Sequence, residues 1–307
     1  MSSPCNAGPR RLGTTPGRAL GWVAIYAVAV LLVAGAIGQP THALADAIFG
    51  SAPPLHEWVS VLLKALAVFG SLICVALLGL RWRDALALRF DGAALTDALN
   101  GFIYGFVSVA LVFALLLALG VRSFHADIDV AWILDALFKA ALTAALVSAI
   151  EELWFRGALT ALLAPLGSGM ALMSVAAIYA SLHFVRPDLA LPAPHAWSDG
   201  FVVISGMFDR LHETQYGDSW LALLVAGIVL GLVRQRSGCI AGCWGWHAGW
   251  VFAIQFGKRL CHLDYSPYRW LVGVYDGVIG VAFIAVTALA LWLYLRGQRR
   301  RWPSHPS

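Results

Sequence analysis

The sequence predicts an all-α polytopic membrane protein, a transmembrane helical bundle of about eight spans with both termini in the cytoplasm. Apolar residues fill 60% of the 307 positions, charged residues fill 12%, and mean hydropathy is +0.76. A soluble domain of this length does not show such a balance. Apolar runs of about bilayer length recur along the chain. Basic residues gather in alternate connections between these runs.

The expected spans follow the apolar runs in chain order. They cover residues 20–38, 59–80, 101–121, 130–150, 170–185, 219–233, 239–257 and 271–295. Several are shorter than the roughly 20 residues that cross a bilayer, so their ends are approximate. The first run follows basic residues and precedes Ala43-Leu44-Ala45, as in a secretory signal. Its apolar stretch exceeds the roughly 7 to 15 residues of a signal core, so we expect a retained anchor.

The arginines and lysines predict the orientation. With the N-terminus in the cytoplasm, thirteen of them fall in inner segments and six in outer segments, while Lys64 and Lys139 lie inside spans. This bias is typical of cytoplasmic termini, and we expect the cytoplasmic membrane of a bacterium. The net charge of +4 then reflects orientation and indicates no nucleic-acid partner. Membrane lipids are expected partners, and the tail Arg299-Arg300-Arg301 suits contact with anionic headgroups.

We expect one membrane body with short tails. A cytoplasmic N-terminal tail covers 1–19, the transmembrane body 20–295, and a basic cytoplasmic tail 296–307. The sequence shows no internal repeat and no boundary within the body. The longest polar connection covers 186–218 and is expected outside. Its apolar stretch Phe201 to Phe208 is too short to span, and either dips into the interface or packs over the outer face.

A charged cluster follows the fourth apolar run. Glu151, Glu152 and Arg156 lie between apolar residues on both sides. Carboxylates at membrane depth are costly unless paired or wetted, so the cluster is a candidate functional site. Glu152 and Arg156 share a helix face and suit an ion pair, whereas Glu151 is turned by about 100° and is the freer carboxylate. The alternative is a cytoplasmic helix end whose charges meet lipid headgroups.

Two of the nine histidines, His183 and His247, fall inside expected spans. Either one alone is more often an interhelical hydrogen-bonding residue than a catalyst. Together with a glutamate, the two histidines indicate a hydrolytic site. A glutamate and a histidine can hold a water and remove its proton, and a second histidine can stabilise an oxyanion. The set Glu151, His183 and His247 is therefore the predicted catalytic site.

These residues also carry a family resemblance. The segment Glu151-Glu152-Leu153-Trp154-Phe155-Arg156-Gly157 resembles the EExxxRG motif of the CPBP intramembrane proteases, which include type II CAAX prenyl endopeptidases and Abi bacteriocin-immunity proteins. The segment from Tyr179 to His183 resembles the second motif, FxxxH. The region from Gly231 to Ala248 resembles the arginine-bearing turn and third motif. The resemblance covers about residues 139–256, the expected protease-like core.

The resemblance implies an all-helical membrane enzyme that hydrolyses a peptide bond near the cytoplasmic face. Its substrate would be a membrane-tethered or lipidated, CAAX-like peptide or lipoprotein. Glu151 would be the general base, His183 would help to hold the attacking water, and His247 would support the oxyanion. Glu152 and Arg156 would be a structural pair.

The third motif departs from the family at one position. Asparagine or aspartate usually stands four residues after its histidine, and this chain has Val251 there. Loss of one oxyanion donor can cost on the order of a hundredfold in rate. The expected substitutes are Trp250, Trp246 and Tyr179. Without a substitute, the protein would be slow or inactive.

A metal site is a second interpretation. Glu151, His183 and His247 also form a plausible zinc set, and Cys239 and Cys243 share a helix face with His247. Small cysteines in transmembrane helices are usually packing residues, and the spacing lacks a CxxC pair. For the glutamate and histidines, metal-free and zinc mechanisms both stay open. Resemblance to glutamate proteases favours the metal-free one, with no cofactor expected.

Two other classes of function remain open. A proton-coupled transporter could use the same titratable groups as a relay, although the repeat typical of many transporters is missing. A non-catalytic scaffold or immunity protein could keep the fold and bind a partner. Val251 is the observation that favours this last class.

Overall fold

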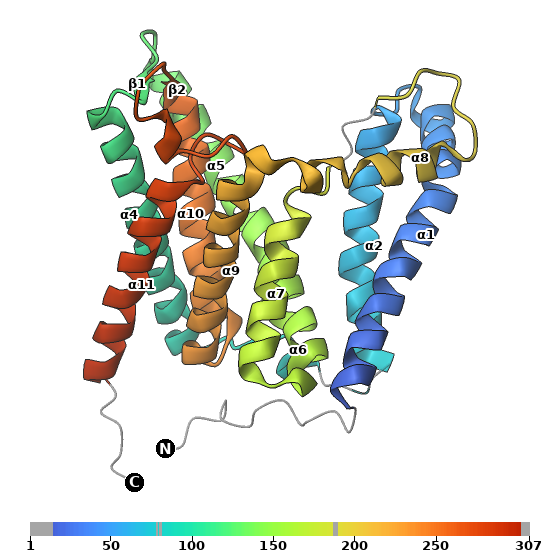
Figure 1. Cartoon of the computed structure of the whole chain (residues 1–307), viewed down its shortest axis with the longest axis horizontal. Helices are drawn as coiled ribbons and strands as arrows, with labels where there is room; N and C mark the ends of the chain where they lie inside the picture. Colours follow the sequence, from blue (N-terminus) through green and yellow to red (C-terminus); the bar gives the residue numbers. More distant parts are fainter. Residues whose placement is uncertain (1–14, 78, 80–81, 187–189, 302–307) are drawn as a thin grey trace. The chain divides into compact units, whose positions relative to one another are not determined.

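The structure is a computed structural model that describes residues 15–77, 79, 82–186 and 190–301. Helices account for most of these residues (Figure 1). The chain divides into two compact units, and no change of composition had indicated this division. Within the described residues, 86–157 and 215–301 form the first unit, and 15–85 and 158–214 form the second. The protease-like core 139–256 therefore contributes to both units.

The first unit is built around α10. Helix α10 (Ile240–Leu260) packs against α4 (Gly92–Ala118), α5 (Val130–Glu152) and α9 (Gly217–Ser237). Helix α11 (Val281–Arg301) packs against α4 and α9. In Figure 1 these helices run side by side as one bundle. Because α10 has neighbours on several sides, its side chains lie in the interior of the unit.

Glycines bring α4 and α10 into backbone contact. A Cβ added to Gly105 would lie 2.1 Å from the carbonyl oxygen of Trp246. A Cβ added to Gly245 would lie 1.9 Å from the carbonyl oxygen of Ala98. Only glycine permits this approach, because backbone atoms cannot move aside as a side chain can. The contact fixes the depth and rotation of α10 immediately before His247.

A two-stranded ribbon closes one end of this unit. Strand β1 (Arg122–Phe124) pairs antiparallel with β2 (Cys261–Leu263). The Arg122 guanidinium is buried and donates to the carbonyl oxygens of Cys261 at 3.2 Å and Gly277 at 2.8 Å. It also lies over the Phe113 ring. This arginine ties the ribbon to the segment before α11.

The last helix begins later in the structure than the sequence predicts. The sequence predicted a helix from residue 271, but α11 begins at Val281. The segment between them holds the 3₁₀ turn η6 (Arg269–Leu271) and a turn at Asp276, whose Oδ1 accepts from the backbone of Val278 and Ile279. Asp276 can satisfy these two donors only in a turn, so the apolar composition of the segment was misleading.

The second unit contains the two N-terminal helices and the long connection. Helix α1 (Pro16–Phe49) packs against α2 (Leu55–Leu77) and α8 (Asp199–Gly206), and α2 also contacts α8. Helix α7 (Ser168–Leu182) lies next to α6 (Thr160–Leu163). The short elements α3 (Trp82–Ala85), η4 (Asp209–His212) and η5 (Thr214–Tyr216) complete the connections.

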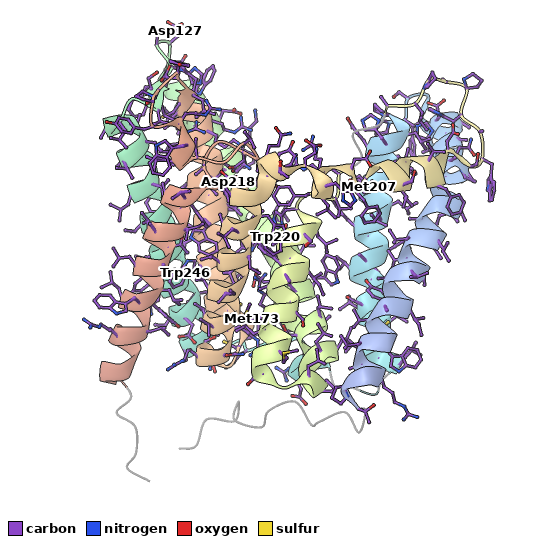
Figure 2. All side chains as sticks on the ribbon, in the orientation of Figure 1. Asp127, Met173, Met207, Asp218, Trp220 and Trp246 are labelled. Carbon is purple, nitrogen blue, oxygen red and sulfur yellow. The ribbon has the colours of Figure 1, made fainter. Side chains whose placement is uncertain are left out.

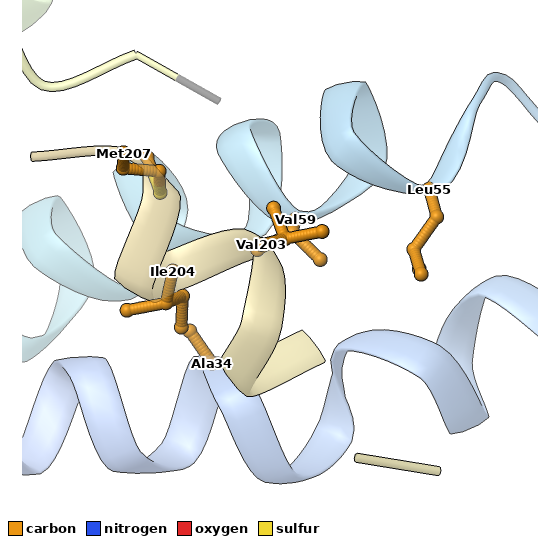
Figure 3. Close-up of a cluster of buried hydrophobic side chains, with 6 residues drawn as sticks. All are labelled: Ala34, Leu55, Val59, Val203, Ile204 and Met207. Carbon is orange, nitrogen blue, oxygen red and sulfur yellow. The ribbon is translucent and has the colours of Figure 1, made fainter. Parts of the chain in front are cut away.

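Helix α8 explains the apolar stretch of the long connection. Val203, Ile204 and Met207 pack with Ala34 of α1 and with Leu55 and Val59 of α2 in a buried cluster (Figure 3). The apolar residues of this stretch are therefore buried against α1 and α2, whereas its position relative to the membrane interface stays a prediction. Pro187, with residues 188 and 189, lies outside the described residues.

The helix lengths agree with a polytopic membrane bundle. Five helices among the described residues are long and apolar enough to cross a membrane: Pro16–Phe49, Leu55–Leu77, Gly92–Ala118, Val130–Leu166 and Thr214–Ser237. Ser168–Leu182 and Val281–Gly297 are shorter apolar helices. Large apolar side chains such as Ile25, Phe69 and Phe138 are exposed, as lipid-facing positions require. Helix α1 begins within the predicted tail 1–19, and α11 continues into the predicted tail 296–307; residues 1–14 and 302–307 lie outside the described part.

Candidate active site

The charged cluster lies inside a helix and not at its end. After Glu152, α5 continues as the π-helix η2 (Leu153–Leu159), then as α6, and finally as the 3₁₀ turn η3 (Ala164–Leu166). The whole helical run covers Val130–Leu166. The interpretation of a helix end meeting headgroups is therefore wrong. A π-helical turn is rare and is frequently found at functional sites.

Glu152 and Arg156 form the predicted ion pair, and both side chains are buried. Arg156 Nη1 donates to Glu152 Oε1 at 3.0 Å, with side-chain exposures of 1% and 0%. Arg156 Nη2 also donates to the carbonyl oxygen of Gly227 in α9 at 3.2 Å. A buried carboxylate and guanidinium are tolerated only when they neutralise each other and make hydrogen bonds. The pair thus joins α5 to α9.

His247 brings the third helix to this pair. Its Nδ1 lies 2.9 Å from Glu152 Oε1, and the ring is 4% exposed. Its Nε2 lies 3.8 Å from Glu151 Oε2, which is beyond hydrogen-bond reach. The two ring nitrogens of His247 therefore face two different carboxylates.

Glu151 is the more accessible of the two glutamates, as its helix position predicted. Its side chain is 26% exposed, against 0% for Glu152. Its Oε2 is nevertheless buried and has no hydrogen-bond partner among the described residues. A carboxylate oxygen in this state can accept a proton or a hydrogen bond from a small molecule. This property suits a general base.

The beginning of α10 sets the depth of His247. Gly238 ends α9 in the left-handed conformation, with φ of 69°, and Cys239 is extended before the first turn of α10. His247 lies seven residues after Ile240, about 10 Å along the helix axis. The sharp turn and the glycine contacts with α4 together place the imidazole beside α5.

Tyr179 and His183 lie in the second unit. His183 follows the last residue of α7 and is half-buried. Its Nδ1 lies 2.7 Å from the carbonyl oxygen of Tyr179, and the two rings meet edge to face at 4.5 Å. Because a carbonyl only accepts, Nδ1 is the donor and Nε2 is an acceptor when the ring is neutral. The approach of His183 to Glu151 stays a prediction.

One of the expected substitutes for the missing donor, Trp250, has another hydrogen-bond partner, whereas the indole N–H of Trp246 has none among the described residues. Trp250 Nε1 donates to Ser108 Oγ of α4 at 3.0 Å, so Trp250 supports the packing of α10 on α4. Trp246 lies within the first unit (Figure 2). Its ring stacks on Tyr104 of α4 and meets Tyr294 of α11 edge to face. Trp250 is therefore a structural residue of the helix interface. Val251 is half-buried, one turn after His247.

The cysteines of α10 pack within the bundle. Cys239 and Cys243 are buried, and the Cys243 thiol donates to the carbonyl oxygen of Ile240 at 3.1 Å. Among the described residues, no group of three His, Cys, Asp or Glu side chains is arranged as ligands of a metal ion. The packing interpretation of these cysteines agrees with their environment.

Sequence reasoning missed the hydrogen bond between Glu152 and His247. It assigned Glu152 to Arg156 alone, because helical spacing reports only on neighbours within one helix. The two residues are 95 positions apart, and no local pattern connects them. One signal was available in the sequence: a histidine inside an apolar span needs a polar partner, and Glu152 is a polar residue just after another predicted span.

The comparisons with known proteins agree with the motifs. Residues 131–253 match the family model described as type II CAAX prenyl endopeptidase Rce1-like. No curated protein and no solved structure matched the chain. The matched segment contains α5, α7, α9 and the first two-thirds of α10, and it includes every predicted site residue. The matched family is a protease family, and the apolar helices make this chain an integral membrane protein. Residues 131–253 are therefore similar to the Rce1-like type II CAAX prenyl endopeptidases, in agreement with the resemblance that the three motifs carry.

Proposed function

We propose that this chain is an intramembrane endopeptidase that cleaves a membrane-tethered or lipidated, CAAX-like substrate near the cytoplasmic face of a bacterial membrane. The observation that carries the proposal is the cluster in which the buried Glu152, Arg156 and His247 meet beside the partly exposed Glu151, within the apolar helical run 130–166 and the helix α10 packed against it. Ionisable groups at such positions are retained for function, because each one is costly in the membrane.

The depth of the cluster supports this position in the membrane. In the proposed orientation, α10 begins on the cytoplasmic side, and His247 lies only about two turns from that end. A lipidated peptide can remain anchored in the inner leaflet while its backbone reaches this level. Water can enter over the same short distance.

In the proposed reaction, the Glu151 carboxylate takes a proton from water, and the water oxygen forms a bond to the carbonyl carbon of the substrate. His183 accepts a hydrogen bond from the same water and orients it. The tetrahedral intermediate then loses its bond to nitrogen, and the leaving amine takes up a proton. General-base catalysis of this kind contributes about a hundredfold to ten-thousandfold in rate.

The test uses full-length protein in liposomes and a fluorescence-quenched peptide that ends in farnesylated Cys-Ala-Ala-Met. Wild-type protein should cleave it, and Glu151→Gln should lower kcat by at least ~100-fold because glutamine cannot take the proton. His183→Ala should also lower kcat. If both variants cleave at the wild-type rate, the mechanism is wrong.

The same assay separates the other classes of function. An unlipidated peptide of the same sequence reports whether the prenyl group is recognised. Proton uptake driven by the peptide without cleavage, and abolished in Glu151→Gln, would instead indicate a transporter. Peptide binding without turnover in both wild-type protein and Val251→Asn would indicate a scaffold.

A further inference from the structure

Resting on the proposed endopeptidase function, we infer that Glu152 and His247 form a carboxylate–imidazole dyad in which Nε2 carries a proton from Glu151 to the leaving amine. Glu152 is the positioning residue of the dyad. His247 then acts as a proton carrier, and a standing oxyanion donor is not its role. This assignment differs from the one that the family resemblance implied.

The hydrogen bond at Nδ1 determines the tautomer. Glu152 Oε1 lies 3.0 Å from the Arg156 guanidinium, which stabilises the carboxylate form. A carboxylate only accepts, so the proton between Oε1 and Nδ1 belongs to the imidazole. A neutral imidazole carries one N–H. The lone pair of neutral His247 is therefore on Nε2, where an oxyanion would need a donor.

The position of Nε2 gives that lone pair a use. It lies 3.8 Å from Glu151 Oε2, so a small shift of either side chain brings the two atoms within hydrogen-bond reach. When Glu151 has taken the proton from water, Nε2 can accept it. The resulting imidazolium is stabilised by Glu152 on its other side, as in carboxylate–histidine pairs that hold a catalytic imidazole.

The proton balance closes over one cycle. Water gives one proton to Glu151 and its hydroxide to the carbonyl carbon. Glu151 passes the proton to His247 Nε2, and Nε2 gives it to the nitrogen as the C–N bond breaks. The products are a carboxylic acid and an amine, and both side chains return to their starting forms. No oxidant, reductant or metal enters the cycle.

The anchoring of Glu152 explains why it can control the tautomer. Arg156 is held by Gly227 of α9, and the same guanidinium holds the carboxylate. Both side chains are buried, with at most 1% exposure, so neither can rotate into solvent. The imidazole on α10 is thus oriented from two other helices.

Glu152→Gln tests the tautomer. Its predicted effect on kcat is a loss if His247 is a proton carrier, and no loss or a gain if His247 is an oxyanion donor. The glutamine amide can donate to Nδ1 and move the ring proton to Nε2. A proton carrier would then fail, and we expect kcat to fall at least ~100-fold with little change in KM; loss of the correct tautomer costs about ten-thousandfold in serine proteases. If His247 were instead an oxyanion donor, the Glu152→Gln variant would keep or gain activity. Unchanged or raised kcat would overturn the inference.

Two further variants control this result. Glu152→Asp retains a carboxylate and should restore at least a tenth of the wild-type kcat. Asp135→Asn makes the same chemical change in α5, at an exposed pair with Lys139, and should leave kcat unchanged. A loss in Glu152→Asp as large as in Glu152→Gln would indicate a purely structural role and would overturn the inference.

A spectroscopic readout works without any substrate. In full-length protein labelled with ¹⁵N-histidine in lipid nanodiscs, His247 is assigned by its loss in His247→Gln. We expect the shift of an unprotonated nitrogen at Nε2 and a protonated Nδ1 in wild-type protein, and the reverse in Glu152→Gln. A proton on Nε2 of the resting wild-type protein would overturn the inference. The peptide chosen for the cleavage assay does not affect this result.

Discussion

His247 Nδ1 and Glu152 Oε1 lie 2.9 Å apart, although 95 residues separate them in the chain. This contact joins α10 to α5, and the hydrogen bond of Arg156 to Gly227 extends it to α9. Three helices of the first unit therefore meet at one charged cluster. The contact also gives each nitrogen of His247 a different neighbour, which is the basis of the proposed proton transfer.

Removal of the guanidinium should destabilise the fold. In Arg156→Met, Glu152 keeps its charge in a buried site without its cation, and breaking a buried pair in this way costs about 3 to 5 kcal/mol. We expect a lower midpoint of thermal unfolding in detergent. The double variant Arg156→Met with Glu152→Gln should recover part of that stability but no catalytic activity. A single variant as stable as wild type would contradict the burial of the pair.

Methyl groups at the α4–α10 contact should displace the imidazole. In Gly105→Ala, the new Cβ would lie 2.1 Å from the Trp246 carbonyl oxygen, so the helices must separate. Both the yield of folded protein and kcat should fall. Gly92→Ala in the same helix is the control, since a Cβ there has no heavy atom within 4 Å. Equal behaviour of the two variants would mean that the helices do not meet closely.

A donor at position 251 should raise the rate. Val251 lies one turn after His247 in α10 and has no hydrogen-bonding side chain. If His247 carries protons, neither His247 nor Val251 donates a hydrogen bond to the oxyanion. Val251→Asn should then increase kcat by tenfold or more, within the roughly hundredfold range of one oxyanion donor. Val251→Leu, which adds no donor, should not. The initial rate of peptide cleavage in liposomes measures both.

Acid should reduce the stability that Asp91 gives the folded protein as the N-terminal cap of α4. Asp91 accepts from the backbone N–H of Ala94 at 2.8 Å at the start of α4 and pairs with Arg89 at 2.9 Å. The hydrogen bond from Ala94, followed by Arg89, lowers the pKa of the Asp91 carboxyl. A lowered folded-state pKa stabilises the protein above the unfolded value of about 3.9 and loses this effect as pH falls through the folded value.

The measurement for the cap compares Asp91→Ala with wild type. The variant should unfold at a lower temperature at pH 7. The difference should shrink as the pH falls below 4, because protonated Asp91 no longer pairs with Arg89. Asp91→Asn, which can still cap the helix, should show a smaller difference at pH 7. A difference that stays constant with pH would show that the charge contributes nothing.

The ribbon should protect a thiol from alkylation. Burial raises the pKa of the Cys261 thiol, only partly offset by Arg122, and the residue is 3% exposed. At pH 8, iodoacetamide should therefore modify Cys261 slowly, since the thiolate is the reactive form.

A glycine near this thiol provides the matching variant. Gly277 has φ of 73°, and a Cβ there would lie 2.5 Å from Leu263 of β2. Gly277→Ala should loosen the ribbon and accelerate modification of Cys261, followed by mass spectrometry of the peptide that contains it. Equal rates in the two proteins would mean that the turn does not hold the ribbon in place.

A chelator tests the metal-free mechanism directly. Cleavage of the farnesylated peptide should be unaffected by 1,10-phenanthroline after overnight incubation, because the proposed reaction uses only side chains and water. Loss of activity that returns on addition of zinc would instead favour the zinc interpretation, with His247 Nε2 as a ligand oriented by Glu152.

The sequence by itself determined the class of the protein and the cluster on α5. Composition and long apolar runs are sufficient for a helical membrane protein, because only hydrogen-bonded helices satisfy the backbone in lipid over such runs. Helical spacing likewise placed Glu152 and Arg156 together and left Glu151 apart, since these relations lie within one helix. The three motifs and the match over residues 131–253 point to the same group of proteases.

Only the tertiary structure decided what the helices do to one another. The contact between Glu152 and His247 depends on how α10 docks on α5, and the bond of Trp250 to Ser108 depends on how α10 docks on α4. The turn at Asp276 replaced the first part of the last predicted span, where Arg122 binds the carbonyl oxygen of Gly277. Periodicity describes one helix at a time, whereas the roles of these side chains are set by backbone approach and buried hydrogen bonds between helices.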